Sequence, residues 1–205
     1  MNASFISRLK QRLTEPLHGR NAQQKMAPSF RPDLQETENT AKAGVLLLLY
    51  PNPIELYLVF IKRTEYPGVH SAQISFPGGK FERSDNDLIH TAIRETQEEI
   101  GVDPSDIDIL GKLTPLYIPV SEMKVYPTVA FTPQQPIFNI APDEVDYIIE
   151  EPLDNLLKSN ITKTKPYDDH KYTGTIPYYD IQGNHVWGAT AMILSEFMEA
   201  IKSAI

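Results

Sequence analysis

Three glutamates stand close together in one short segment of the sequence. Glu95, Glu98 and Glu99 fall within Arg94-Glu95-Thr96-Gln97-Glu98-Glu99 and would occupy a sector of roughly 100° on a helix. Carboxylates at this spacing repel one another by about a few tenths of a kcal/mol per pair. A divalent cation would offset the repulsion, since hard ions take carboxylate oxygens and attract phosphates. A solvated acidic face, with Arg94 pairing Glu98 one turn later, explains the same residues without a metal.

The glutamates belong to a longer pattern that runs from Gly78-Gly79 to Gly101-Val102. This pattern resembles the Nudix box, G-x₅-E-x₇-R-E-U-x-E-E-x-G-U, in which U is aliphatic. Thr96 takes the place of one aliphatic residue, Asp85 takes the place of the first Glu, and one extra residue separates Asp85 from Arg94. The two departures in the front half resemble the coenzyme A diphosphatase branch of the Nudix superfamily.

A second signature of that branch, R-S-x₃-R-x₃-G-x₃-F-P-G-G, lies just upstream. Arg63-Thr64, Gly68, Ala72 and Phe76-Pro77-Gly78-Gly79 stand at its spacings. Thr replaces Ser, Gly68 replaces the second Arg, and Ala72 replaces Gly. The spacing of this signature is kept, but only some of its residue types are kept. The sequence therefore indicates the Nudix superfamily more strongly than its coenzyme A diphosphatase branch.

The resemblance implies which residues carry the chemistry. It places Glu95, Glu98 and Glu99 at metal-binding and base positions and implies a further metal ligand in the carbonyl of Gly78. Glu144 is a candidate for the extra acid that Nudix enzymes often bring from a later loop, although a surface role fits it equally well. Arg94 is expected to hold a carboxylate such as Glu98, Glu82 or Asp85 in place.

Several residues are candidates for contacts with the substrate, and a surface role is open for each. The cations could meet phosphate groups, and Gly79 lets the backbone pass close to them. Aromatic residues could stack on a base, although core packing explains them too. The phosphate-side candidates are Arg63, Lys62, Lys80, Lys124, His70 and Gly79, and the aromatic candidates are Trp187, Tyr117 and Tyr126.

The implied activity is hydrolysis of a diphosphate linkage, assisted by Mg²⁺ or Mn²⁺. The branch points to a small nucleotide substrate of the coenzyme A type, with 3′,5′-ADP and 4′-phosphopantetheine as products. Another Nudix substrate, such as NADH, ADP-ribose or a nucleoside triphosphate, stays open. The alternative from a different class is a Nudix-fold binding module without catalysis, but such proteins usually lose the glutamates that this chain keeps.

Composition narrows the class of protein further. A formal net charge of −8 argues against nucleic acid as a partner, and the absence of cysteine leaves oxygen or imidazole ligands for a metal. The longest apolar run, residues 45–50, is far shorter than the roughly 20 residues of a membrane-spanning helix, so no membrane contact is expected. We expect a cytoplasmic protein. The oligomeric state stays open, with a homodimer among the options.

Apolar periodicity predicts the elements that position these residues. Helices are expected over 3–17, 86–100 and 188–205, and an irregular arm over 19–40. Strands are expected over 43–50, 55–62, 107–117, 125–131, 176–181 and 185–187, with a strand or short helix within 145–157. This order predicts an α/β fold, a Nudix-like α/β/α sandwich around a mixed sheet. Residues 1–40 would form an N-terminal helix and arm, and 41–205 the Nudix domain.

Overall fold

The computed structural model describes residues 2–32, 36–38, 40–68, 70–169 and 172–205. The helices are α1 (Asn2–Arg12), α2 (Arg20–Gln24), α3 (Leu88–Ile100), α4 (Leu153–Leu156) and α5 (Gly188–Ala204), with 3₁₀ turns at Pro104–Asp106, Pro119–Ser121 and Ser159–Ile161. The strands are β1 (Ala41–Pro51), β2 (Leu56–Arg63), β3 (Ile74–Ser75), β4 (Gly78–Lys80), β5 (Asp108–Lys112), β6 (Leu116–Ile118), β7 (Met123–Phe131), β8 (Val145–Pro152), β9 (Thr162–Asp168), β10 (Thr173–Ile181) and β11 (Asn184–Trp187).

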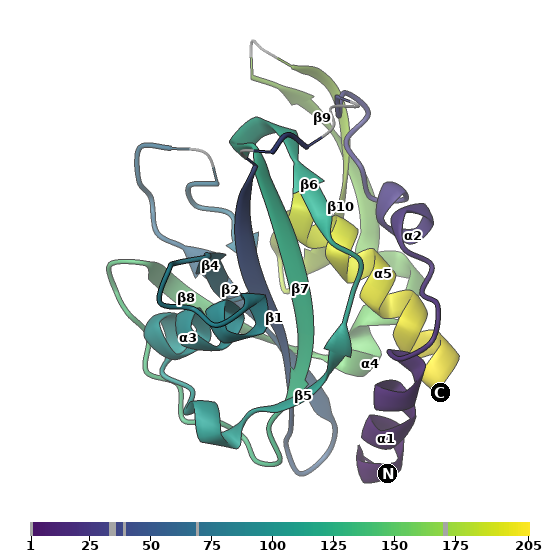
Figure 1. The fold of residues 1–205 in the computed structure, drawn as a ribbon. Helices are drawn as coiled ribbons and strands as arrows, with labels where there is room; N and C mark the ends of the chain where they lie inside the picture. The colour runs from purple at the N-terminus through teal and green to yellow at the C-terminus, as the bar shows by residue number, and fades with distance from the viewer. Residues whose placement is uncertain (1, 33–35, 39, 69, 170–171) are drawn as a thin grey trace.

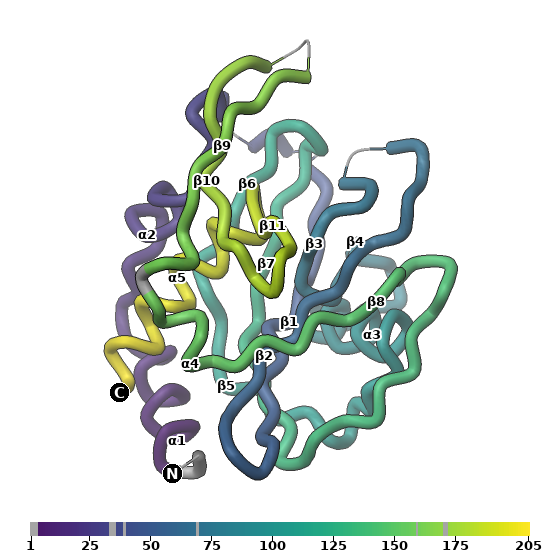
Figure 2. The backbone as a smooth tube through the Cα atoms, turned by 180° about the vertical axis from the view of Figure 1, so that it is seen from behind, coloured from purple at the N-terminus to yellow at the C-terminus, as the bar shows by residue number. Residues whose placement is uncertain are grey.

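A mixed sheet forms the centre of the molecule (Figure 1). Its middle strand β1 pairs in parallel with β7, in a register that runs from Ala41 opposite Met123 to Leu49 opposite Phe131. On its other side β1 pairs antiparallel with β2 and with the short β4. Strand β8 extends the sheet beyond β2. A separate sheet of β9, β10 and β11 lies beside α5 (Figure 2).

The apolar run of β1 is buried on both faces of the sheet. Leu47 and Leu49 belong to a core shared with α1 and α5, while Leu46, Leu48 and Tyr50 belong to a second core shared with α3. Alternate side chains of a strand point to opposite faces, so a continuous apolar run serves two layers of helices. The predicted α/β/α sandwich around a mixed sheet is therefore confirmed.

The face that α3 buries consists mostly of small or polar side chains. Ile89 and Ile93 are half-buried, whereas the buried residues of the helix are Thr91, Ala92, Thr96, Glu99 and Ile100. The reason is close packing against β1, where a Cβ added to Gly44 would lie 2.3 Å from the carbonyl oxygen of Leu88. Small side chains fit under this crossing, and large aliphatic ones are displaced to its edges.

The N-terminal segment also differs from the prediction. The first helix ends at Arg12 instead of residue 17, since Pro16 cannot donate a backbone hydrogen bond to continue it. The arm expected to be irregular contains the short helix α2, whose buried Gln23 donates to Glu196 of α5 at 2.9 Å. Tertiary contacts stabilise this turn, and the local sequence carries no periodic signal for it.

Two strand predictions need correction. The strand expected over 107–117 is divided into β5 and β6, because Thr114 turns to Glu196 and donates its hydroxyl at 2.6 Å, and Pro115 has no N–H to offer. Strand β9 was not predicted, since most of its side chains are exposed and show no apolar alternation. The strands expected over 176–181 and 185–187 are found as the hairpin of β10 and β11, with Gln182 and Gly183 both at positive φ as its two-residue turn requires.

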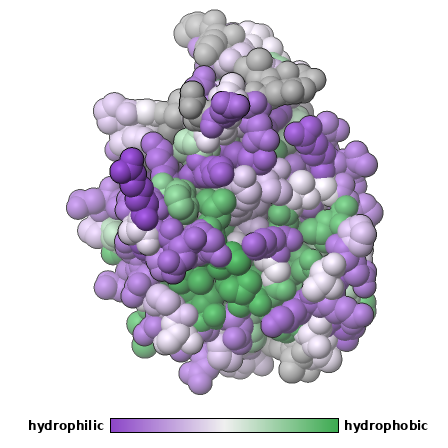
Figure 3. All heavy atoms as spheres, in the orientation of Figure 1, coloured by the Kyte–Doolittle hydropathy of each residue, from purple (hydrophilic) through white to green (hydrophobic). Residues whose placement is uncertain are grey.

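The surface is mainly polar, with apolar side chains gathered low on the face of Figure 3, between the positions of α3 and α1. Exposed apolar area of this kind is common on folded proteins and identifies no partner by itself. Among the described residues, no helix is long and apolar enough to cross a membrane.

Candidate active site

Helix α3 positions the three glutamates over one face of the central sheet, where it packs against β1 and β4. Asp87 caps its N-terminus by accepting from the backbone N–H of His90 at 2.8 Å, and Gly101 ends it in the left-handed conformation at φ 74°. The side chain of Glu99 is 1% exposed and that of Glu95 14%, whereas that of Glu98 is 55% exposed. The predicted stripe therefore passes from the protein interior to solvent, and a solvated face describes Glu98 alone.

Glu99 is held by two donors from the loop signature upstream of the helix. The backbone N–H of Gly78 donates to Oε2 at 2.8 Å, and Nη1 of Arg63 lies 3.2 Å from Oε1. Gly78 adopts φ 146°, and a Cβ there would lie 2.3 Å from the carbonyl oxygen of Gly44. Only glycine permits this approach, which aims the N–H of the loop at the buried carboxylate.

Burial and neighbouring acids raise the pKa values of both buried glutamates. Burial is the main cause for Glu99, whose pKa rises to about 7 despite the N–H of Gly78 and the charge of Arg63. Burial also raises the pKa of Glu95, partly offset by Arg94. The charge of Glu144 adds to both increases, so this exposed loop residue lies near enough to act on the two carboxylates.

A second cluster ties the loop to the helix through Arg94 and Asp85. Arg94 donates to the two carboxylate oxygens of Asp85 at 2.9 and 3.1 Å, to Glu98 at 2.9 Å and to the carbonyl of Lys80 at 3.2 Å. Its Nη1 also lies 2.9 Å from Glu95. The arginine beside it holds the pKa of Asp85 well below its usual range. Arg94 is thus placed to hold carboxylates, as the sequence predicts.

The donor set suits a hard divalent ion by its chemistry. Glu95, Glu99 and Glu144 offer oxygen ligands on two segments, and their mutual repulsion is what a cation would relieve. At Gly79 a Cβ would lie 2.4 Å from the carboxylate of Glu95, so the backbone passes directly over this acid. Within the described ranges no three acidic or histidine side chains already converge on one point. Arg63 pairs with Glu99, and Arg94 pairs with Glu95.

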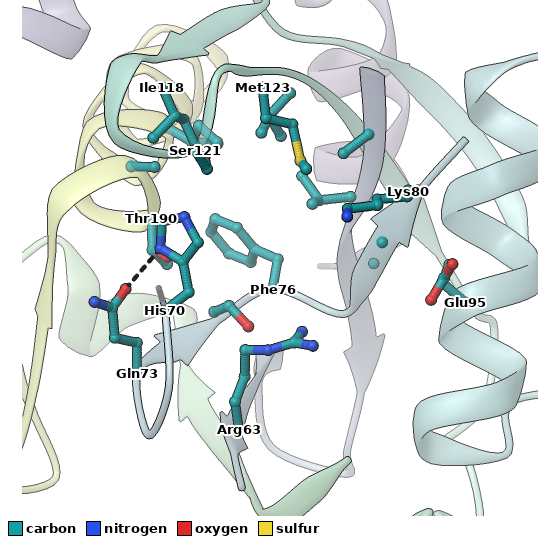
Figure 4. A pocket seen from close by; sticks show the side chains of 18 of the residues that line it. Arg63, His70, Gln73, Phe76, Lys80, Glu95, Ile118, Ser121, Met123 and Thr190 are labelled. Carbon is teal, nitrogen blue, oxygen red and sulfur yellow. Dashed lines mark hydrogen bonds between the residues drawn. The ribbon is translucent and has the colours of Figure 1, made fainter. Parts of the chain in front are cut away.

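A cavity of about 580 Å³ opens beside the acidic helix (Figure 4). Glu95 and Lys80 lie at one end, Arg63 reaches in from β2, and His70 and Thr190 lie at the opposite end. The wall between them is mostly apolar. The lining includes Val45, Ile74, Phe76, Ile118, Met123 and Ile193. Its size and character are those of a small-molecule site.

The structure brings some of the predicted substrate contacts together and separates others. Arg63, Lys80, His70 and Gly79 line the cavity. Lys62 donates to the carbonyl of Ala72 and is not among the residues that line it. Lys124 does not line the cavity either, since it pairs with Glu36 at 2.8 Å and lies over the ring of Tyr126. Gly78 lies at the cavity wall with its N–H bonded to Glu99.

Three polar atoms at the cavity wall have no partner in the described part of the chain, and the sequence indicated only one of the residues that carry them. Nε2 of His70 and the hydroxyl oxygens of Ser75 and Ser121 are buried and have no hydrogen-bond partner among the described residues. A buried polar atom without a partner costs about 1–3 kcal/mol, so such atoms mark places for a ligand or water. His70 was a candidate because of its position in the upstream signature, but single serines carry no pattern that would have indicated the other two.

The raised pKa of Glu99 gives a testable dependence of stability on pH in the metal-free protein. Between the unfolded pKa near 4.3 and the folded value of about 7, the folded state binds more protons, so a rise in pH lowers its stability. Glutamine does not titrate, so the variant Glu99→Gln lacks this dependence of stability on pH. In EDTA the variant should gain roughly 1–3 kcal/mol over wild type on going from pH 5 to pH 8, as measured by urea unfolding.

Glu98→Gln is the matched control, because it removes an exposed acid from the same helix. Its difference from wild type should change little over this pH range. An equal pH dependence for both variants would show that burial of Glu99 is not its cause.

Comparison with known proteins agrees with this geometry. The family model of the NUDIX domain matches residues 40–170. An uncharacterized Nudix hydrolase NudL from Pectobacterium atrosepticum is 33% identical over 178 residues, which cover 85% of this chain and 88% of that protein. The chloroplastic Nudix hydrolase 22 of Arabidopsis thaliana is 32% identical, over 84% of this chain and 57% of that protein.

Solved structures show the same fold. A MutT/nudix family protein from Enterococcus faecalis superposes with a TM-score of 0.53 at 18% identity, covering 89% of this chain and 73% of that one. The sandwich and the acidic helix define the Nudix class of fold. The chain belongs to the Nudix family, and it is a hydrolase of diphosphate-linked nucleoside substrates.

Proposed function

We propose that this protein hydrolyses the diphosphate linkage of coenzyme A or one of its derivatives and releases 3′,5′-ADP and 4′-phosphopantetheine. The observation that carries the proposal is the position of the upstream signature. Arg63, Gly68, Phe76, Gly78 and Gly79, which stand at the spacings of the coenzyme A branch, all line the cavity next to the acidic helix. The residues that resemble this branch are therefore the ones that a substrate would meet.

The proposed roles follow from the contacts of each side chain. Glu95 and Glu99, with Glu98, Glu144 and the Gly78 carbonyl as further ligands, would hold Mg²⁺ or Mn²⁺ next to the diphosphate. When bound, the metal would neutralise the diphosphate and lower the pKa of the attacking water. Arg94 keeps Glu95 and Glu98 in place through its bonds to Asp85. One of the helix carboxylates would serve as general base.

Arg63 is placed to connect the metal ligands with the substrate. It pairs with Glu99, yet its side chain remains 25% exposed and lines the cavity. A guanidinium in this position has further donors for a phosphate oxygen. We propose that Arg63, with Lys80, neutralises part of the charge of the diphosphate, and that Gly79 lets this group approach without a side chain in the way.

A substrate panel tests the proposal. With Mg²⁺ or Mn²⁺, purified protein should convert coenzyme A faster than NADH, ADP-ribose or ATP, with 3′,5′-ADP and 4′-phosphopantetheine identified by chromatography. Rapid turnover of another dinucleotide with none of coenzyme A would overturn the coenzyme A assignment and leave the family membership intact. Binding of nucleotides without turnover of any would instead support a non-catalytic binding module.

A further inference from the structure

A second cavity of about 380 Å³ continues from the end of the first one that lies away from the glutamates. The two cavities share Gly68, His70, Gln73, Ile118 and Ala189 as lining residues. The two cavities therefore adjoin at these residues, and a ligand that occupies both would pass His70. The proposed hydrolysis takes place in the first cavity and does not use the second one. The lining of the second cavity therefore indicates which other part of the substrate binds there.

The second cavity is lined by aromatic rings from three separate segments. Phe30 comes from the N-terminal arm, Tyr167 and Tyr172 from the β9–β10 hairpin, and Trp187 from the end of β11. Phe30 stacks on Tyr167 at 4.9 Å and on Tyr172 at 5.5 Å, and Tyr167 lies 5.6 Å from Trp187. All four rings are half-buried, so packing leaves part of each exposed.

Polar groups are distributed along the edge of this aromatic cavity. Arg31 and Asp169 line it as a donor and an acceptor, and Arg31 also donates to the carbonyl of Tyr117. An alkyl or acyl chain would gain nothing from a guanidinium and a carboxylate at its edge. A flat heterocycle with ring nitrogens and an exocyclic amine can use the ring faces and both polar groups.

The junction between the cavities has two of the three unpartnered polar atoms already described. His70 and Ser121 lie at this end of the first cavity (Figure 4). Nδ1 of His70 lies 3.2 Å from Oε1 of Gln73, which can only accept, so the proton belongs on Nδ1 and Nε2 is left as an acceptor. Sugar hydroxyls are suitable partners for this nitrogen and for the serine hydroxyl.

We propose that the aromatic cavity binds the nucleobase of the substrate, with the ribose at the His70 junction and the diphosphate beside Glu95. This assignment rests on the proposed function in assuming a nucleoside diphosphate derivative, but it does not require coenzyme A. It also gives residues 1–40 a part in the site, because Phe30 and Arg31 line the base-binding cavity together with residues of the domain we propose over 41–205.

Binding can be measured without turnover, because Trp187 is the single tryptophan of the chain. We expect 3′,5′-ADP, titrated in EDTA and excited where adenine does not absorb, to quench the fluorescence of Trp187 in a saturable manner. Ribose 5-phosphate and 4′-phosphopantetheine should not do so at the same concentrations. Quenching by 4′-phosphopantetheine alone would place the other half of the substrate in this cavity and overturn the proposal.

Variants of the rings separate stacking from folding. Phe30→Ala should raise the Kd of 3′,5′-ADP by about 5- to 100-fold, the range expected for loss of base stacking. Phe30→Leu keeps most of the apolar packing but removes the ring, and it should weaken binding by a similar factor.

Tyr147→Ala is the matched control, since it removes a partly exposed ring that lines neither cavity. Unchanged binding in Phe30→Leu, with circular dichroism like that of wild type, would contradict the stacking role. Quenching by 3′,5′-ADP in a protein that does not hydrolyse coenzyme A would retain the base-binding cavity and reject only the choice of substrate.

Discussion

Replacing Glu99 by glutamine should lower kcat by about two or more orders of magnitude while the protein still folds. The substitution keeps the volume of the side chain and an acceptor for the N–H of Gly78, but it removes the negative charge at the buried end of the acidic stripe. Metal catalysis contributes several kcal/mol of transition-state stabilisation, and a weakened metal site loses much of it. Mn²⁺ titration and steady-state kinetics on the same preparation would measure both effects.

Two further variants make this result specific. Glu95→Gln should behave like Glu99→Gln, because Glu95 lines the cavity and lies under Gly79. Glu82→Gln should be milder, since Glu82 is exposed and lies outside the helix. Wild-type turnover with intact Mn²⁺ binding in Glu99→Gln would refute the role assigned to the buried carboxylate.

Asp85→Ala should produce the largest loss of stability, about 3–5 kcal/mol in urea unfolding, as is typical when one partner of a buried ion pair is removed. The carboxylate of Asp85 is fully buried and accepts from Arg94, from the hydroxyl of Thr91 at 2.9 Å and from the backbone N–H of Glu82 at 2.9 Å. Alanine would remove this shared acceptor from all three donors. Asp85→Asn, which keeps one carbonyl oxygen, should cost less.

Asp87→Ala is the matched control for this prediction. Asp87 is exposed, lies two residues away and caps α3 with a single hydrogen bond, so its loss should cost about 1 kcal/mol. Equal costs for the two alanine variants would mean that the cluster around Asp85 contributes no more than an ordinary cap.

Patterns local in the chain were enough to predict much of the site. The spacing of Glu95, Glu98 and Glu99 placed them on one stripe of a helix, and the helix, its end at Gly101 and the pair of Arg94 with Glu98 are found in the structure. The apolar run of β1 likewise predicted a buried strand. These features depend on backbone periodicity and on contacts within one or two turns, which neighbouring residues determine.

Only the tertiary structure decided which end of the acidic stripe is buried. The close approach of Gly44 to α3 turns Glu99 inward and leaves Glu98 in solvent, and no local pattern encodes that crossing. The same holds for the arrangement of Phe30 with Tyr167, which lie far apart in the sequence but stack at 4.9 Å. The sequence by itself determined the family, the helix and the chemistry of its acids. Packing between distant segments determined their burial, their pKa values and the shape of the cavities, because these depend on contacts that form only when the layers assemble.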